Sequence, residues 1–177
     1  MPVEVKRAEG WLNISFSTSA TPEAVYEYVA DLRRHGDWAG TLGSVTQTSD
    51  GPVAVGTTYR AEERMRPGGK AGDVSFSEIT GLERPRRIAW KARTEPTSGP
   101  MAMRSEWEFL IEPDGVGSRV TQRMRFDPPN VMSRVFLAIF LPIADLMGGM
   151  GASPKMVRRN VEQLEEQLST MAGGPPA

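Results

Sequence analysis

A chain of 177 residues is about one domain long, and its net charge of −1 creates no field that would attract nucleic acid or an anionic membrane. The absence of cysteine excludes a disulfide framework and a thiolate metal site, and a single histidine argues against a zinc centre. No phosphate loop, dinucleotide fingerprint or signal peptide is present, so we expect a cytoplasmic protein without metal or cofactor.

The first elements predicted are a strand and two short helices. Leu12, Ile14 and Phe16 alternate with polar residues, which is the pattern of a half-buried strand. Thr21-Pro22-Glu23 is typical of a helix start, with Thr as N-cap, Pro at the first helical position and an acid in the first turn. Residues 31–38 predict a second short helix or turn.

Six further strands follow, separated by short turns rich in Gly, Pro and Asp. Because no helices lie between them, they predict an antiparallel meander and a sheet of about seven strands in total. One strand should contain a bulge, since Val74 and Phe76 have one parity and Ile79 has the other. The predicted strands span residues 44–48, 57–65, 73–82, 87–94, 101–112 and 117–126.

The C-terminal part divides at a glycine-rich break after residue 147 into two predicted helices. Residues 131–147 are strongly apolar but shorter than the roughly 20 residues that a membrane-spanning helix needs. Residues 155–171 form a long amphipathic helix with one apolar stripe. The tail, residues 172–177, is expected to be disordered.

The order of one strand, two short helices, six strands and a long helix is that of the α+β helix-grip fold. Local motifs agree with it: residues 55–60 (VGTTYR), 78–90 (EITGLERPRRIAW), 106–109 (EWEF) and 117–121 (GSRVT). Over residues 3–171 the chain resembles the START-like superfamily (SRPBCC), in its polyketide cyclase/dehydrase-like branch. The resemblance implies a single ligand-binding domain, residues 1–171, with a curved antiparallel sheet around the long C-terminal helix.

In that fold the concave face of the sheet and the long helix enclose a cavity. Strand alternation assigns side chains to this face, and the helix stripe supplies the opposite wall. The residues that we expect to bind a ligand are Trp38, Tyr59, Trp90, Met103, Ser105, Trp107, Gln122, Met124, Phe126, Val157, Val161 and Leu164.

Two polar residues share otherwise apolar faces. Glu63 is a candidate general acid/base or ligand anchor, because burial raises the pKa of a carboxyl group. Alternatively it lies near the sheet edge and is solvated. Gln122 is a candidate hydrogen-bond donor to a ligand carbonyl, or else it bonds to a neighbouring group.

His35 is a second candidate catalytic residue. We expect it at the mouth of the cavity, where it would form an acid/base pair with Asp37. The alternative is a histidine at a solvated helix end.

Three functions remain open. The first is binding of a small apolar or aromatic molecule; if the protein is an enzyme, the resemblance implies a cofactor-free cyclase or dehydratase in which Glu63 or His35 carries the proton. The second is a non-catalytic carrier or sensor for a lipid-like or hydrophobic ligand. The third is a protein-interaction module acting through residues 131–147, as in a homodimer. We expect no nucleic-acid partner. Residues 131–147 are expected to be buried or to form a partner surface, with membrane docking as the alternative.

Overall fold

The computed structural model describes residues 3–64, 67–96, 103–128, 131–147 and 153–172. Within these ranges one eight-stranded antiparallel sheet has the order β1-β2-β8-β7-β6-β5-β4-β3. The strands are β1 (Glu4–Ala8), β2 (Trp11–Thr18), β3 (Leu42–Gln47), β4 (Thr58–Arg64), β5 (Ala71–Glu83), β6 (Arg87–Pro96), β7 (Met103–Asp114) and β8 (Gly117–Phe126). The predicted ends at residues 65, 101 and 102 and the tail 173–177 lie outside the described residues.

The additional strand is β1, which the sequence pattern did not reveal. It pairs with β2 at the edge of the sheet, and all five of its residues are exposed. A strand that is solvated on both faces has no apolar alternation by which to recognise it.

The described ranges contain four helical segments: α1 (Pro22–Ala30), the 3₁₀ helix η1 (Leu32–Asp37), α2 (Val131–Leu146) and α3 (Pro154–Ala172). The predicted N-cap of α1 is confirmed, because the Thr21 hydroxyl accepts a hydrogen bond from the Ala24 amide at 3.3 Å. Asp31 caps η1 in the same way, through the Arg33 amide at 3.0 Å.

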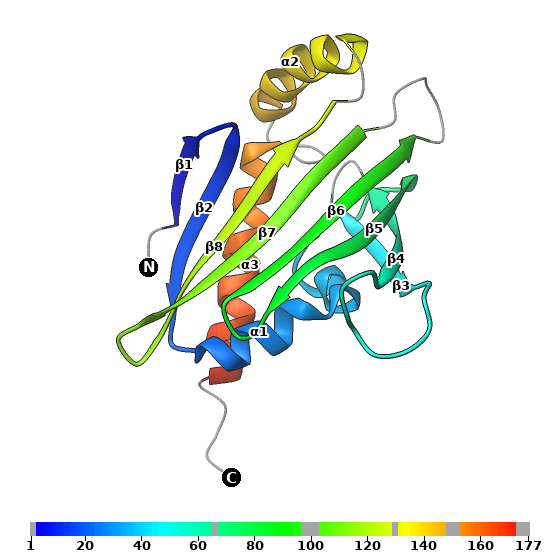
Figure 1. Cartoon of the computed structure of the whole chain (residues 1–177). Helices are drawn as coiled ribbons and strands as arrows, with labels where there is room; N and C mark the ends of the chain where they lie inside the picture. The colour runs from blue at the N-terminus through cyan, green and yellow to red at the C-terminus, as the bar shows by residue number, and fades with distance from the viewer. Residues whose placement is uncertain (1–2, 65–66, 97–102, 129–130, 148–152, 173–177) are drawn as a thin grey trace.

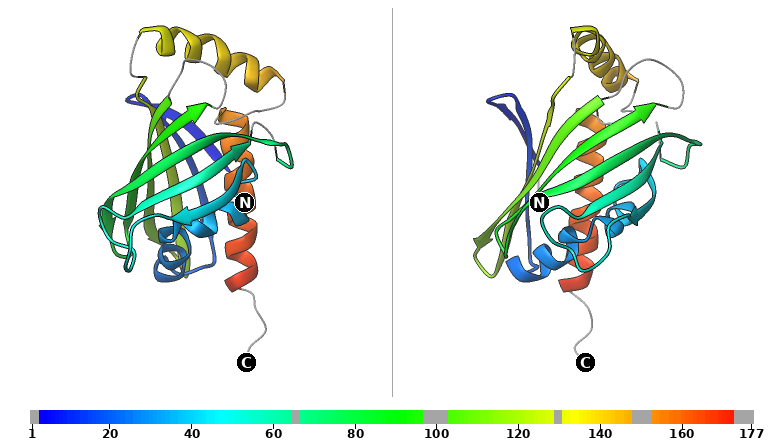
Figure 2. Two further views of the ribbon diagram at one scale, coloured as in Figure 1. Left: turned by 90° about the vertical axis from the view of Figure 1, so that its right-hand side faces the viewer. Right: turned by 45° about the vertical axis from the view of Figure 1, so that its right-hand side comes forward.

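The sheet is strongly curved, and α3 lies along its concave side (Figure 1). Helix α1 closes one end of the curve, and α2 lies beyond the opposite end (Figures 1 and 2). This is the helix-grip arrangement expected from the sequence. It gives the sheet an inner face, towards α3, and an outer face.

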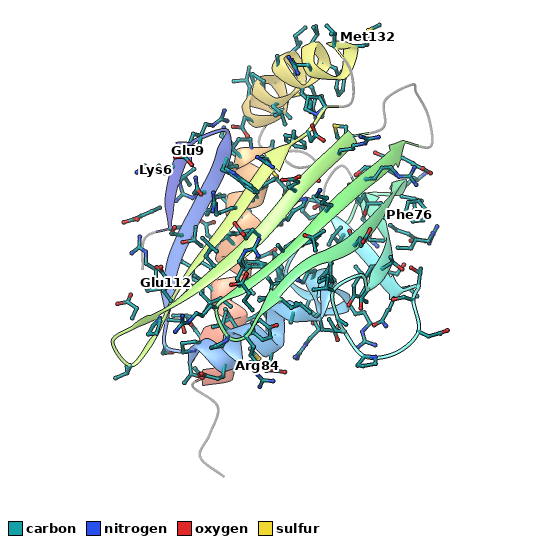
Figure 3. All side chains as sticks on the ribbon, in the orientation of Figure 1. Lys6, Glu9, Phe76, Arg84, Glu112 and Met132 are labelled. Atoms are coloured by element: carbon teal, nitrogen blue, oxygen red, sulfur yellow. The ribbon has the colours of Figure 1, made fainter. Side chains whose placement is uncertain are left out.

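The predicted bulge is present in β5, where the pairing with β6 shifts between Ile79 and Gly81. Before the shift, Ser75 and Ile79 are buried on the inner face. Val74 and Phe76 therefore point outward; Phe76 is 37% exposed and is visible at the edge of the molecule in Figure 3.

The core lies between the inner face and α3. Four members of the predicted helix stripe, Val157, Val161, Leu164 and Leu168, are buried against sheet residues, but Met171 is 45% exposed. The predicted stripe, which ran to Met171, is therefore one residue too long, because α3 extends beyond the sheet that it covers.

The outer face carries cross-strand ion pairs. Arg119 pairs with Glu4 at 2.6 Å, and Arg123 with Glu108 at 3.1 Å. Charged side chains on this side, including Lys6 and Glu112, extend into solvent (Figure 3). The inner face is the chemically distinctive one.

Candidate functional site

The inner face is organised in rows of directly opposed residues that cross the strands. These rows define which predicted site residues are neighbours. They are the Tyr59 row (Tyr59, Ser77, Ala92, Ser105, Phe126), the Trp90 row (Ile79, Trp90, Trp107, Met124, Leu12) and the Phe109 row (Leu82, Ile88, Phe109, Gln122, Ile14).

An aromatic cluster occupies the middle of this face. The rings of Trp90 and Trp107 stack nearly parallel with 6.0 Å between centroids. Phe109 lies 5.8 Å from the Trp90 ring and 6.0 Å from the Trp38 ring. From η1, His35 adds a ring 4.8 Å from Trp38. Aromatic pairs at such separations stabilise a core beyond their buried area.

Three buried side-chain atoms of the inner side have no hydrogen-bond partner within the described residues: Trp38 Nε1, Tyr59 Oη and Gln122 Oε1. Each residue is at most 3% exposed. An unpaired polar atom in such a position typically costs about 1–3 kcal/mol. The fold thus buries two hydrogen-bond donors and one acceptor without partners, and this lowers its stability.

Two of these three residues, Trp38 and Gln122, lie at the aromatic cluster, and Tyr59 lies nearer the start of η1. Gln122 stands directly opposite Phe109, against which Trp38 also packs. Burial raises the pKa of the Tyr59 phenol, and the charge of Asp31 raises it further, which places this hydroxyl near the start of η1. Strand parity assigned Tyr59 and Gln122 to the inner side, and the structure agrees; Trp38, expected at the mouth of the cavity, is buried in the core.

Glu63 projects from β4 into a polar end of the inner face. The Thr94 hydroxyl donates to its Oε1 at 3.3 Å, Ser75 forms a second hydrogen bond, and Asp73 stands directly opposite. Burial is the main cause that raises the pKa of Glu63, and Asp73 adds to it, while the two hydroxyl hydrogen bonds act against it. Glu63 is half-buried and hydrogen-bonded, so the simple picture of a solvated edge residue does not hold.

His35 has a different environment from the one expected. It is 4% exposed, within the aromatic cluster, and its Nε2 donates to the Val29 carbonyl at 2.9 Å. Burial lowers the pKa of His35 to about 4. Asp37, its predicted partner at a cavity mouth, has an exposed side chain and acts instead on Tyr28, whose pKa is raised by burial and then by this charge. The prediction of a cavity-mouth acid/base pair is therefore wrong, because η1 directs His35 inward and leaves Asp37 exposed.

The other predicted binding residues line the same face. Ser105 accepts a hydrogen bond from Trp107 Nε1 at 2.8 Å, and Met103 stands opposite Thr94. Val157, Val161 and Leu164 supply the α3 wall as predicted.

Sequence reasoning missed Ser75 and Thr94 as partners of Glu63. Thr94 shares the parity of Trp90, so its inward position was available from the pattern. The position of Ser75 was hidden by the bulge in β5.

One hollow lies at the α2 end of the inner face. It has a volume of about 170 Å³ and is lined by Leu12, Met124 and Phe126 of the sheet together with Leu141 of α2 and Pro154 of α3. Trp11, Arg7, Gly10 and Arg125 complete its rim. Two predicted binding residues, Met124 and Phe126, thus border this hollow.

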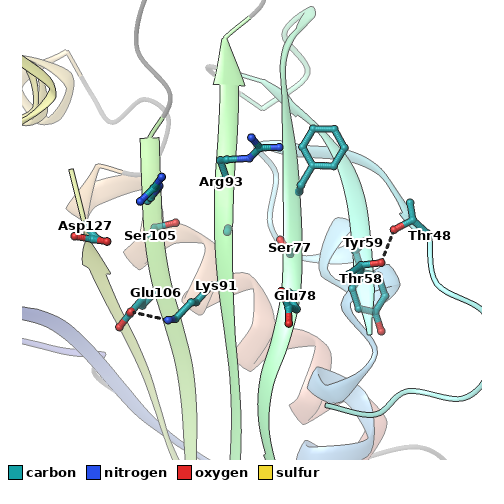
Figure 4. Close-up of a pocket in the computed structure, with 13 residues that line it drawn as sticks. Thr48, Thr58, Tyr59, Ser77, Glu78, Lys91, Arg93, Ser105, Glu106 and Asp127 are labelled. Carbon is teal, nitrogen blue, oxygen red and sulfur yellow. Dashed lines mark hydrogen bonds and ion pairs between the residues drawn. The ribbon is translucent and has the colours of Figure 1, made fainter. Parts of the chain in front are cut away.

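A larger groove of about 590 Å³ crosses β4 to β7 on the outer face (Figure 4). Its sides are charged: Lys91 lies 3.6 Å from Glu106, and the Arg93 guanidinium lies 5.5 Å from the Phe76 ring centroid. Tyr59 and Ser105 also line the groove, but they belong to the Tyr59 row, whose side chains point to the inner face. Balanced surface ion pairs of this kind are typical of a solvated sheet face.

Two kinds of site are absent from the ranges that the structure describes. No group of three or more His, Asp or Glu side chains there is placed to hold a metal ion. No helix there has both the length and the apolar character needed to cross a membrane.

The chain belongs to the family described as polyketide cyclase / dehydrase and lipid transport, because the model of that family matches residues 13–169. It is 29% identical over 126 residues to the uncharacterized protein Rv2574 of Mycobacterium tuberculosis. The aligned residues cover 71% of this chain and 70% of that protein.

Solved structures confirm the fold. Protein Ms6760 from Mycobacterium smegmatis matches with a TM-score of 0.66 at 15% identity, covering 96% of this chain and 99% of that one. A protein from Arthrobacter aurescens matches with a TM-score of 0.67 at 18% identity, covering 94% and 91%.

Proposed function

We propose that this protein binds a small apolar or aromatic molecule between the inner face of the sheet and α3. The observation that carries the proposal is the set of unpaired buried atoms, Trp38 Nε1, Tyr59 Oη and Gln122 Oε1, among aromatic rings. A ligand with a hydroxyl or carbonyl group would pair them and recover the cost of burying them unpaired.

The chemistry of these atoms indicates the ligand class. The indole of Trp38 can only donate, so it suits a ligand carbonyl, whereas the free atom of Gln122 is a carbonyl oxygen that accepts from a ligand hydroxyl. This reverses the donor role expected of Gln122 from sequence. An oxygenated polycyclic aromatic compound meets both requirements and would stack on the rings of this face.

Entry at the α2 end is supported by the hollow beside Met124 and Phe126. Its volume of about 170 Å³ is below the roughly 300–1,000 Å³ usual for small-molecule sites. We therefore expect the side chains of Leu12, Phe126 and Leu141 to move apart when such a ligand enters.

If the bound molecule is also turned over, Glu63 is the better proton carrier of the two candidates. Its raised pKa and half-buried position allow it to hold a proton near a ligand and exchange it with solvent. His35 is enclosed by Trp38, Trp90 and Phe109, and its Nε2 is engaged by Val29.

Tyr59→Phe tests the role of the unpaired hydroxyl. Removing it should raise the free energy of unfolding by about 1–3 kcal/mol, because an unpaired buried polar atom is lost. Affinity for 1,8-dihydroxyanthraquinone should fall about 5-fold or more, as expected for one lost hydrogen bond of about 1 kcal/mol. Urea unfolding and thermal-shift titration measure the two effects.

Tyr28→Phe in α1 is the matched control, since its hydroxyl is not among the unpaired buried atoms. It should leave ligand affinity unchanged. Unsubstituted anthracene, which has no polar group, should bind wild type and Tyr59→Phe equally. A Tyr59→Phe protein that is less stable and binds the anthraquinone as well as wild type would contradict the proposal.

A further inference from the structure

The solvent-facing side of α2 is a continuous apolar surface. Seven large apolar side chains of this segment, all aliphatic or methionine, are between 48% and 83% exposed. They form what we call the α2 face: Val131, Met132, Val135, Ile139, Ile143, Leu146 and Met147. In Figure 3, Met132 projects from α2 away from the sheet.

No charged group interrupts the α2 face. At 100° per residue, Arg134 and Asp145 fall on the opposite side of the helix. Asp145 is already engaged, because its carboxylate accepts from the Lys155 amide at 3.0 Å and its backbone carbonyl accepts from Lys155 Nζ at 2.8 Å. The side of α2 towards the rest of the chain is covered, with Leu137 and Ala144 buried.

The α2 face is as large as the largest apolar patch of a typical monomer. An aliphatic side chain offers roughly 60–120 Å² when it is fully exposed, so seven of them that are 48–83% exposed present on the order of 400 Å². The largest apolar patch of a typical monomer measures about 300–600 Å² and often has a function. The half-buried rings of Phe136 and Phe140, which stack 5.1 Å apart, adjoin it. Together they approach the roughly 600 Å² per partner at which specific interfaces begin.

The spacing of the exposed residues is symmetric. Met132, Val135, Ile139, Ile143 and Leu146 follow one another at intervals of three, four, four and three residues, so the stripe reads alike in both directions from Ile139. A two-fold axis makes each surface patch meet itself in reverse. Two antiparallel copies centred on Ile139 would therefore set Val135 against the partner's Ile143 and Met132 against the partner's Leu146.

We propose that α2 is the homodimer interface of this protein, formed by two antiparallel α2 helices that cross at Ile139. A second copy suits this face better than a membrane surface does. Helices that lie on membranes are rich in Lys and Arg, whereas α2 has one Arg and one Asp and the chain has a net charge of −1.

Analytical ultracentrifugation of the full chain over a range of concentrations tests the assembly. The wild type should sediment with twice the 19.4 kDa mass of one chain. Ile139→Lys would place two ammonium groups at the axis and should weaken the dimer by about 100-fold or more. Val116→Lys is the control: Val116 is 94% exposed in the turn between β7 and β8, and its substitution should leave the dimer intact.

Cysteine cross-linking tests the antiparallel arrangement, because the natural chain has no cysteine. Ile139→Cys should form a disulfide-linked dimer under mild oxidation. Met132→Cys alone should not, since its two copies would be about 21 Å apart along the helices. The double variant Met132→Cys/Leu146→Cys should cross-link efficiently.

A wild type that stays monomeric at all concentrations would overturn the proposal. If that monomer then floats with vesicles of phosphatidylcholine and phosphatidylglycerol, and Ile139→Lys does not, the α2 face is a lipid surface. A dimer that persists in Ile139→Lys would likewise overturn it. Cross-linking of Met132→Cys alone, in a dimer that Ile139→Lys disrupts, would refute the antiparallel arrangement.

Discussion

Phe109→Ala is expected to lower the free energy of unfolding by about 3–5 kcal/mol. Phe109 is fully buried, and its ring contacts the rings of Trp38, Trp90 and His35. Removing it leaves a cavity that rigid aromatic neighbours cannot fill. Because small domains are stable by only about 5–15 kcal/mol, this single change consumes a large share of the total. Urea unfolding followed by tryptophan fluorescence measures it.

Phe76→Ala is the matched control on the outer face of the same sheet. Phe76 is 37% exposed and contacts the Arg93 guanidinium. Its removal should cost no more than about 1 kcal/mol, the value of an exposed cation–π contact. Equal losses for Phe109→Ala and Phe76→Ala would show that the aromatic cluster is not the centre of the core.

Stability should fall by roughly 3 kcal/mol as the pH is lowered from 6.5 to 4, owing to His35 alone. Burial lowers the pKa of His35 from 6.5 to about 4 in the folded protein. The unfolded chain takes up this proton near pH 6.5, whereas the folded chain resists it until about pH 4. The contribution of His35 is therefore complete above pH 6.5 and is lost as the pH falls through about 4.

Glu63 acts in the opposite direction and must be separated from His35. Its pKa is raised in the folded state, chiefly by burial, so acid favours the folded protein at this site. The contribution of Glu63 is the same in wild type and in His35→Gln, so it drops out of the difference between their unfolding free energies. Glutamine keeps a donor for the Val29 carbonyl but does not titrate. That difference should decrease steadily from pH 7 to pH 4; a constant difference would refute the buried position of His35.

Periodicity predicted most of the individual elements, because each central strand and α3 has one buried face, and the resemblance to the START-like superfamily predicted their arrangement. Leu12, Ile14 and Phe16 are buried as their alternation indicated, and Val161 and Leu164 face the sheet as their spacing indicated. The strand β1 could not be predicted from periodicity, since neither of its faces is buried.

The sequence predicted which residues form the candidate site, but not which of their polar atoms lack a hydrogen-bond partner. Parity placed Tyr59 and Gln122 on the inner face, yet which polar atoms find partners depends on the cross-strand register and on neighbours distant in sequence. The burial of His35 was equally unpredictable from local sequence. A histidine between Arg34 and Gly36 looks solvated, and only the docking of η1 against Phe109 reveals that it is buried.

We propose that the ligand binds at the aromatic cluster of the inner face. The four tryptophan indole N–H signals in a ¹H–¹⁵N NMR spectrum test it most directly, during titration with 1,8-dihydroxyanthraquinone. Trp38 should shift most, because its unpaired N–H gains an acceptor, and Trp90 and Trp107 should follow. Trp11 contacts Arg123 and Arg125 and only borders the hollow at the α2 end, so its shift should be smaller than that of Trp38. Saturable binding that shifts Trp11 and leaves Trp38, Trp90 and Trp107 unchanged would contradict this account.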